Sequence, residues 1–158
     1  MATQLSNLSD HDPSNIPSGA GMRIALVVSE WNEAITGSLA KGAFDTLVQY
    51  SVDPSDIIIK HVPGSFELPM GAQLLLDSGS WDAIILLGCV IQGETRHFDF
   101  ICDAVANGIT TVGLKYNKPV IFGVLTTNSI QQALDRAGGK HGNKGEEAAI
   151  SAIKMLGF

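Results

Sequence analysis

The sequence predicts an α/β fold in which a central parallel sheet of four strands carries helices on both faces. The first observation is that four short apolar segments alternate along the chain with segments whose apolar residues recur at helical spacing. The second is that residues 83–87 are aliphatic throughout, with no polar interruption. Such a run is typical of a parallel strand that is buried on both faces.

The first half of the chain supplies two predicted strands and two predicted helices. Residues 23–29 form the first strand, and aliphatic residues at helical spacing predict a helix over residues 33–50. An Asp-Pro-Ser turn at residues 53–55 precedes the second strand, residues 56–62. A short helix over residues 69–77 follows.

The second half continues the alternation. Its predicted elements are a strand over residues 82–90, a long helix from His97 to near residues 115–119, a strand over residues 120–125, and helices over residues 129–137 and 146–156. Asn128 with Gln131 resembles a capping box at the start of the helix over residues 129–137, and the Gly138-Gly139 pair is expected to end it.

Ligands of open parallel sheets bind beyond the carboxyl ends of the strands, where the strand order reverses. Three predicted loops would meet there: residues 30–32, 64–67 and 89–97. The third loop carries two glycines and leads into a helix start, where free backbone N–H groups favour an anion. We therefore expect the chemistry at this edge of the sheet.

The composition limits the classes of function. A chain of 158 residues fits one domain, residues 22–158, preceded by a polar arm, residues 1–21. Charged residues make up only 16%, against about 25% in ordinary soluble domains. Burial of surface against other copies would explain this, and so would a compact monomer with a large core.

The charge and the apolar pattern exclude several partners. A formal net charge of −6 without a basic run argues against nucleic acid. No apolar segment reaches the ~20 residues of a membrane span, and the chain does not start like a signal peptide. Cys89 and Cys102 make no disulfide framework, so we expect the reducing cytoplasm.

His97 is the strongest catalytic candidate because it lies in the first turn of a predicted helix. A helix start disfavours the imidazolium, so the ring should accept a proton near neutral pH. The alternative is a hydrogen-bonded structural histidine. A metal site with Cys102 lacks a third ligand, so no metal is expected. Glu94 and Thr95 could present N–H groups to a phosphate, or simply form a loop that enters a helix.

Four more residues have both a functional and a structural interpretation. Trp31, just past a strand end, could stack on a ring or pack at an interface. Glu67 in an apolar context could bind ligand hydroxyls or favour a helix start. Arg136 and Lys144 could bind a phosphate, or be solvated cations near helix ends.

Four motifs taken together resemble the 6,7-dimethyl-8-ribityllumazine synthase family. They are SEWNEAIT at residues 29–36, VPGSFELP at residues 62–69, GCVIQGETRHFDFIC at residues 88–102, and PVIFGVLTTNSIQQALDRAGGKHGNKG at residues 119–145. They span the chain from about Arg23 onward, and several long motifs in one order are far more specific than any single glycine pattern. Arg96 departs from the small or neutral residue usual before this histidine.

The resemblance implies a flavodoxin-like three-layer sandwich and the penultimate step of riboflavin synthesis. The substrates would be 5-amino-6-(D-ribitylamino)uracil and 3,4-dihydroxy-2-butanone 4-phosphate, with no metal or organic cofactor. It also implies a homo-oligomer, either a pentamer or a multiple of pentamers such as an icosahedral shell. The active site would lie between subunits, and riboflavin synthase is an expected partner.

The resemblance also implies residue roles. Trp31 would stack on the uracil ring. His97 would transfer protons, with Glu147 as its orienting carboxylate. Glu94 and Thr95 would receive the phosphate and Arg136 would clamp it, with Arg136 and Phe122 coming from the neighbouring subunit. The residues implied, besides Trp31, to hold the pyrimidine and its ribityl chain, or to lie beside it, are Asn32, Ser65, Phe66, Glu67, Cys89, Val90, Ile91, Phe122 and Lys144.

Two alternatives compete with the enzyme. A flavin- or lumazine-binding module without catalysis could use Trp31 and the phosphate loop equally well. A mainly structural shell protein would assemble even when His97 and Arg136 are changed. His97, Arg136, Glu67 and Lys144 are all present at matching positions, which favours the enzyme.

Overall fold

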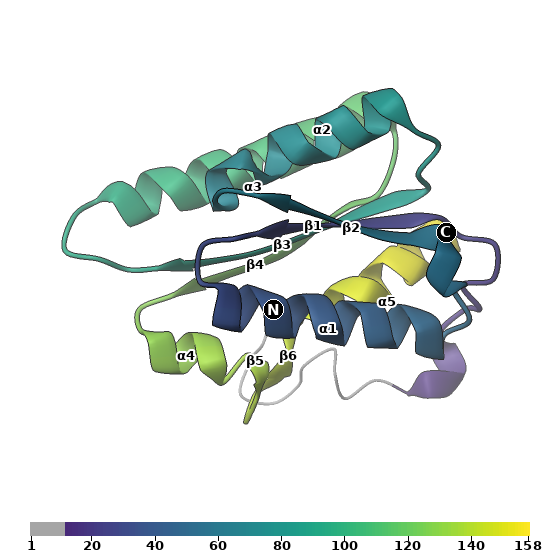
Figure 1. Ribbon diagram of the computed structural model, residues 1–158, viewed down its shortest axis with the longest axis horizontal. Coiled ribbons are helices and arrows are strands. Elements are labelled where there is room, and N and C mark those ends of the chain that lie inside the picture. The colour runs from purple at the N-terminus through teal and green to yellow at the C-terminus, as the bar shows by residue number, and fades with distance from the viewer. Residues whose placement is uncertain (1–11) are drawn as a thin grey trace.

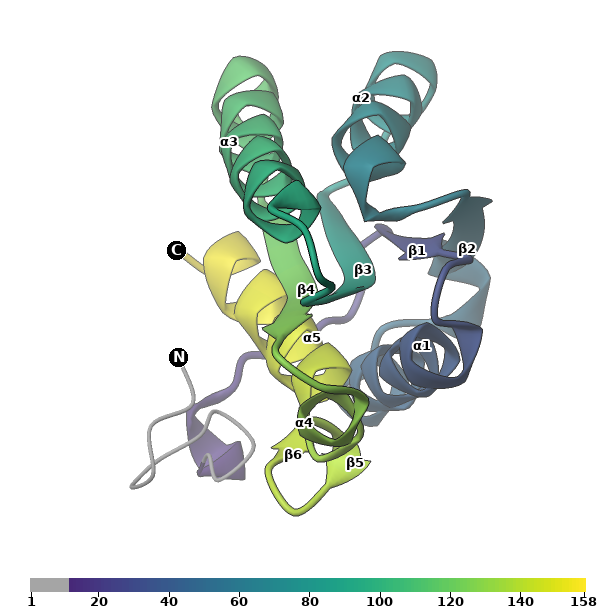
Figure 2. The ribbon, with the colours of Figure 1, turned by 90° about the vertical axis from the view of Figure 1, so that its left-hand side faces the viewer.

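The computed structural model describes residues 12–158, and Figure 1 shows its three layers edge-on. A sheet lies between helices α2 and α3 on one face and helices α1 and α5 on the other (Figures 1 and 2). The main elements are β1 (Ile24–Ser29), α1 (Glu33–Gln49), β2 (Ile57–Val62), α2 (Leu68–Ser78), β3 (Ala83–Ile91), α3 (His97–Tyr116), β4 (Val120–Thr127), α4 (Ile130–Leu134) and α5 (Lys144–Leu156).

The sheet has four parallel strands in the order β2-β1-β3-β4. The chain moves from β1 outward to β2 and then returns to the other side of β1 to form β3. The strand order therefore reverses between β1 and β3, and a ligand site is expected at the carboxyl ends of these two strands. The predicted parallel sheet with helices on both faces is confirmed.

Two hydrophobic cores hold the layers together, and alternate side chains of each central strand point into them. Ile24, Leu26 and Val28 pack in the core toward α1 and α5, whereas Ala25 and Val27 pack in the core toward α2 and α3. All six residues of β1 are buried. Burial on both faces explains why the central strands are continuous aliphatic runs.

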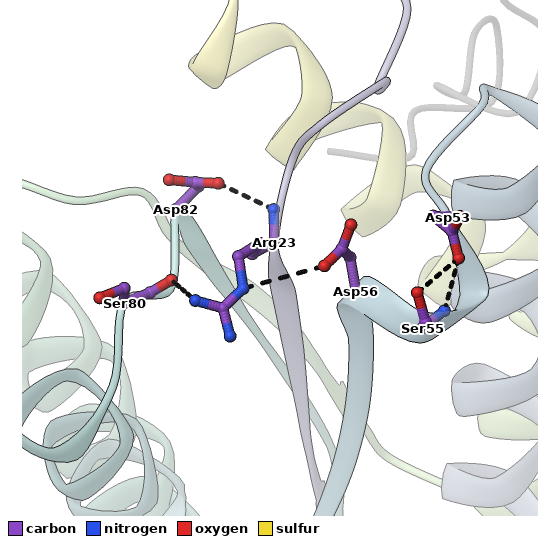
Figure 3. A network of polar contacts seen from close by, with 6 residues as sticks. All are labelled: Arg23, Asp53, Ser55, Asp56, Ser80 and Asp82. Atoms are coloured by element: carbon purple, nitrogen blue, oxygen red, sulfur yellow. Dashed lines mark hydrogen bonds and ion pairs between the residues drawn. The ribbon is translucent and has the colours of Figure 1, made fainter.

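Arg23 joins three segments at the amino edge of the sheet (Figure 3). Its backbone N–H donates to Asp82 Oδ2 at 2.8 Å, and its Nη1 donates to the Ser80 carbonyl at 3.0 Å. Its Nε lies 3.9 Å from Asp56 Oδ1, and its guanidinium lies 4.9 Å from the centre of the Trp81 ring. The edge opposite the predicted site is thus fixed by polar contacts.

The turn at residues 53–55 begins a short 3-10 helix, Pro54–Asp56, before β2. Asp53 caps this helix, because its Oδ1 accepts hydrogen bonds from the backbone N–H of Ser55 at 2.8 Å and from its hydroxyl at 2.7 Å (Figure 3). A second 3-10 helix, Ser65–Glu67, leads directly into α2.

The predicted helix over residues 129–137 is wrong in its length and in its cap. Helix α4 is capped by Ser129, whose Oγ accepts from the Gln132 N–H at 3.3 Å, while Gln132 Oε1 accepts from the Asn128 N–H at 2.9 Å. The reciprocal cap therefore lies one residue later than predicted.

A two-stranded antiparallel hairpin follows α4 where the prediction had the end of a helix and a loop. Its strands are β5 (Ala137–Gly139) and β6 (Gly142–Asn143). Gly138 has φ +105° and Gly142 has φ +76°, conformations that favour glycine. Helix α5 then begins at Lys144, two residues before the predicted start.

The predicted arm is described only from residue 12 onward, and residues 1–11 lie outside the described part. The described part contains a 3-10 helix, Pro13–Asn15, and Ile16 packs against the core on the α1 side. The backbone N–H of Gly19 donates to the Tyr50 carbonyl at 2.6 Å. Among residues 12–158, no helix combines the length and apolar character needed to cross a membrane.

Candidate active site

A pocket of about 600 Å³ opens at the carboxyl ends of β1, β2 and β3. The three loops that were predicted to converge there do so. The lining residues are Trp31 and Asn32 after β1, Gly64 to Glu67 after β2, Cys89 to Ile91 at the end of β3, and His97 and Ile101 of α3. We refer to this as the first pocket.

Strand β3 extends beyond β1 and leaves one of its edges free in the first pocket. The last pair between these strands is Val28 with Leu87, whereas β3 continues beside β4 as far as Ile91. Asn32 Nδ2 donates to the Cys89 carbonyl at 3.0 Å. This side chain therefore makes a hydrogen bond to β3 where β1 no longer pairs with it. Main-chain groups beyond Leu87 are thus placed to meet a planar, hydrogen-bonding ligand.

Asn32 makes this contact because of its backbone conformation. It is the N-cap residue of α1, with φ 63° and ψ 43°, and its side chain makes no capping hydrogen bond. Asparagine tolerates this left-handed region better than most residues. The amide that would ordinarily cap the helix reaches across to β3 instead.

Two aromatic side chains at the first pocket remain open to solvent. Trp31 is 73% exposed and Phe66 is 56% exposed. The backbone N–H of Trp31 donates to the Pro63 carbonyl at 3.2 Å, which fixes the loop after β1 to the loop after β2. Exposed rings on a braced backbone can stack on a flat ligand with little loss of conformational freedom.

The polar groups of the first pocket differ in burial. Ser65 is buried, and its Oγ has no hydrogen-bond partner within residues 12–158. Glu67 is half-buried, directly before α2. Cys89 is 2% exposed, and burial raises the pKa of its thiol to about 11. The Cys89 thiol is therefore neutral near pH 7 and is a poor nucleophile there.

His97 is the first residue of the 20-residue helix α3, and its side chain is exposed. Its backbone N–H lies 3.4 Å from Thr95 Oγ1, which accepts a weak hydrogen bond. Glu94 and Thr95 are exposed in the loop before it. Gln92 Nε2 shapes this loop by donating to the Gly93 carbonyl at 2.9 Å and the Thr95 carbonyl at 3.4 Å.

The charge of Arg96 is engaged on its own helix. Its Nε lies 3.4 Å from Asp99 Oδ2, and its guanidinium lies 5.8 Å from the centre of the Phe100 ring. Its side chain is 82% exposed, so the ion pair is weak.

A second pocket of about 130 Å³ lies at the end of β4, beside the hairpin and the start of α5, and it contains the cationic side chains of Arg136 and Lys144. Its lining residues are Thr126, Thr127, Arg136, His141, Lys144 and Glu147. Glu147 is buried, and its Oε2 accepts from Lys144 Nζ at 2.8 Å. Arg136 Nη1 donates to the Gln132 carbonyl at 3.2 Å.

The structure thus separates the expected site residues into two groups. The contact that was expected between Glu147 and His97 is not made within the described chain, because the carboxylate pairs with Lys144 in the second pocket. Phe122 is 38% exposed on β4 and lines neither pocket. Within one chain, the expected site residues that line a pocket therefore lie in two separate pockets.

Sequence reasoning missed several lining residues. Ile101 lines the first pocket, and Thr126, Thr127 and His141 line the second. His141 lies between Arg136 and Lys144, and this local gathering of cationic residue types was a signal that could have found it. Among residues 12–158, no group of three or more His, Cys, Asp or Glu side chains could hold a metal ion.

Comparison with known proteins gives one consistent result. A family model described as 6,7-dimethyl-8-ribityllumazine synthase matches residues 21–158. A protein of that name from Cytophaga hutchinsonii is 57% identical over 156 residues, which cover 99% of this chain and 98% of that protein. Proteins of the same name from Porphyromonas gingivalis and Parabacteroides distasonis are 52% and 51% identical over 158 residues, which cover 98% and 99% of those proteins and 100% of this chain.

Proposed function

The chain belongs to the 6,7-dimethyl-8-ribityllumazine synthase family, and we propose that its two pockets divide the work of that transferase between neighbouring subunits. The reaction joins 5-amino-6-(D-ribitylamino)uracil to 3,4-dihydroxy-2-butanone 4-phosphate. It yields the lumazine, phosphate and water, in the penultimate step of riboflavin biosynthesis. The observation that carries the proposal is the convergence of both exposed aromatic rings and His97 on the free edge of β3.

The first pocket receives the pyrimidine in this proposal. Trp31 stacks on the uracil ring with its exposed face, and Phe66 supports it from the facing loop. Main-chain groups of Cys89, Val90 and Ile91 read the edge of the uracil, while Asn32 holds their strand in place. The Cys89 side chain is buried and neutral, so it contributes shape rather than chemistry.

The ribityl chain meets the polar side of the same pocket. The Ser65 hydroxyl is buried and has no partner within the described residues, so a hydroxyl of the ligand would supply the missing hydrogen bond. The Glu67 carboxylate accepts hydrogen bonds from further hydroxyls. These contacts fix the pyrimidine amine before the second substrate arrives.

The phosphate of the second substrate binds at the start of α3. Backbone N–H groups of Glu94 and Thr95 meet it there, aided by the positive end of the helix dipole. Among residues 12–158, no lysine or arginine lines the first pocket, whereas Arg136 and Lys144 line the second. A neighbouring subunit that places its second pocket against this helix start would supply the missing cations, together with Phe122 and Glu147.

The chemistry then follows from this arrangement. The pyrimidine amine attacks the ketone and forms an imine with loss of water. Phosphate leaves by elimination, and the ring closes with loss of a second water. His97 accepts and returns the protons. Arg136 stabilises the charge on the departing phosphate. Much of the acceleration comes from holding two substrates together.

The proposal includes an assembly. The active site requires at least two adjacent copies, and we propose a pentamer or a multiple of pentamers. The low share of charged residues and the exposed Leu114, Met155 and Phe158 side chains are consistent with further buried contacts between copies. We further propose that the described arm contacts a neighbouring subunit. Riboflavin synthase is the expected consumer of the product, and the cytoplasm is the expected location.

The test is turnover of the purified protein with both named substrates, followed by the absorbance and fluorescence of the lumazine. His97→Ala should lower kcat by about 100-fold and leave a measurable rate, because proximity is retained. His61→Ala is the matched control, since His61 is exposed on β2 and lies outside the pocket. Folded protein that binds riboflavin without turnover would replace the enzyme with a binding module.

A further inference from the structure

Two hydrogen bonds fasten the hairpin to helix α1, and a third caps the start of α5. Ser38 Oγ donates to the Ala137 carbonyl at 2.6 Å, and Asn143 Nδ2 donates to the Ser38 carbonyl at 3.1 Å. Asn143 Oδ1 accepts from the Gly145 N–H at 2.8 Å. Asn143 is 5% exposed, so one buried amide both caps α5 and joins it to α1.

The backbones approach closely at this place, and two glycines permit it. A Cβ added at Gly42 would lie 2.6 Å from Asn143 Nδ2. A Cβ added at Gly145 would lie 1.9 Å from the Leu39 carbonyl oxygen. Gly42 and Gly145 therefore leave room for the Asn143 amide to sit between the two helices. The geometry is specific, because a buried amide must satisfy its groups without water.

This junction fixes both ends of the segment that carries the cations of the second pocket. Ala137, held by Ser38, follows Arg136 directly, and Asn143 directly precedes Lys144. The Lys144 N–H donates to the Arg136 carbonyl at 2.9 Å, which closes the segment on itself. His141 lies between these ends and lines the same pocket.

We propose that Asn143, together with Ser38, is a positioning residue that sets how tightly the phosphate-bearing substrate is held. The inference rests on the proposed function. Arg136 and Lys144 flank this short hairpin and would otherwise lose alignment, and a bidentate arginine contact is sensitive to orientation. Because the first pocket does not depend on this junction, binding of the pyrimidine should be spared.

The experiment measures both KM values and kcat for Asn143→Ser and Ser38→Ala. Serine at residue 143 retains the cap of α5 but cannot reach the Ser38 carbonyl. Alanine at residue 38 removes only the hydroxyl that holds Ala137. Asp53→Ala, which removes a helix cap near the opposite edge of the sheet, is the matched control.

The expected result is a KM for 3,4-dihydroxy-2-butanone 4-phosphate about 10-fold higher in both variants, with a pyrimidine KM within about twofold of the unchanged chain. The inhibition constant of inorganic phosphate should rise by a similar factor. Equal rises in both KM values, or a loss of thermal stability with both KM values unchanged, would overturn the inference. If Asn143→Ser does not fold, Ser38→Ala alone decides. Absence of turnover in the unchanged chain would refute the proposed function instead.

Discussion

The Lys144–Glu147 ion pair should be strongly asymmetric in its contribution to stability. Lys144 Nζ and Glu147 Oε2 are 2.8 Å apart. The Lys144 side chain is 24% exposed, whereas that of Glu147 is 5% exposed. Removal of one partner leaves the other with a different access to water, so the two single substitutions should not cost the same.

Lys144→Met leaves a buried carboxylate whose observed partner within residues 12–158 is gone. Breaking a buried pair in this way costs about 3 to 5 kcal/mol. Glu147→Gln leaves an ammonium on a four-carbon stem that can reach solvent, and the new amide oxygen still accepts a hydrogen bond. Its cost should be about 1 kcal/mol, within the range of exposed pairs. The difference between the variants is therefore at least about 2 kcal/mol.

Urea unfolding at one fixed chain concentration measures this difference, because the stability of an oligomer depends on concentration. The double variant Lys144→Met/Glu147→Gln provides the internal control, and it should regain part of the loss caused by Lys144→Met alone. Equal costs for the two single variants, or a greater cost for Glu147→Gln, would refute the reasoning. Such a result would mean that the carboxylate has a partner other than Lys144.

Three further outcomes follow from other parts of the molecule. Trp31→Ala should raise the KM for the pyrimidine by about 5- to 150-fold, since stacking on a base is worth about 1–3 kcal/mol, whereas Trp31→Phe should stay within about threefold. The free energy of unfolding should not change in either variant, because the Trp31 side chain is 73% exposed. Burial raises the pKa of the Cys89 thiol from 9.0 to about 11 in the folded chain. The contribution of the neutral thiol to the free energy of unfolding is therefore complete below pH 9. That stability is lost as the pH rises toward 11, so urea unfolding at pH 8.5 and 10.5 should show an extra loss of up to about 2 kcal/mol relative to Cys89→Ala. Arg23→Met should lower the free energy of unfolding by about 1 to 2 kcal/mol and leave kcat unchanged, because its contacts lie at the amino edge of the sheet.

The layers and the position of the first pocket could be predicted because each rests on a local pattern. Apolar runs buried on both faces identify parallel strands, and alternation with helices then fixes the side on which each loop emerges. The carboxyl-end loops with Trp31, Phe66 and His97 had to meet at one edge of such a sheet. No pairing between distant residues was needed for this step.

The second pocket could not be predicted in the same way, because it depends on contacts between distant segments. The strands β5 and β6 contain five residues, and four of them are glycine or asparagine, which favour turns or caps, so the sequence resembles a loop after a helix. The hairpin is ordered by Ser38 and by Asn143, which lie 105 residues apart in the chain. The predicted cap of α4 was wrong by one residue for a different reason. Asn128 and Ser129 are both good N-cap residues, so the sequence does not distinguish between them.

Helix α1 links the two pockets of each chain. Its N-cap residue, Asn32, holds the free edge of β3 in the first pocket, and Ser38, less than two turns later, holds the hairpin of the second. If each active site combines the first pocket of one subunit with the second pocket of the next, α1 aligns parts of two different active sites at once. An error in the placement of this helix would then impair both neighbours of a subunit. Under that arrangement, glycine at residue 42 and asparagine at residue 143 would be constrained by the geometry of assembly as well as by the packing of one chain.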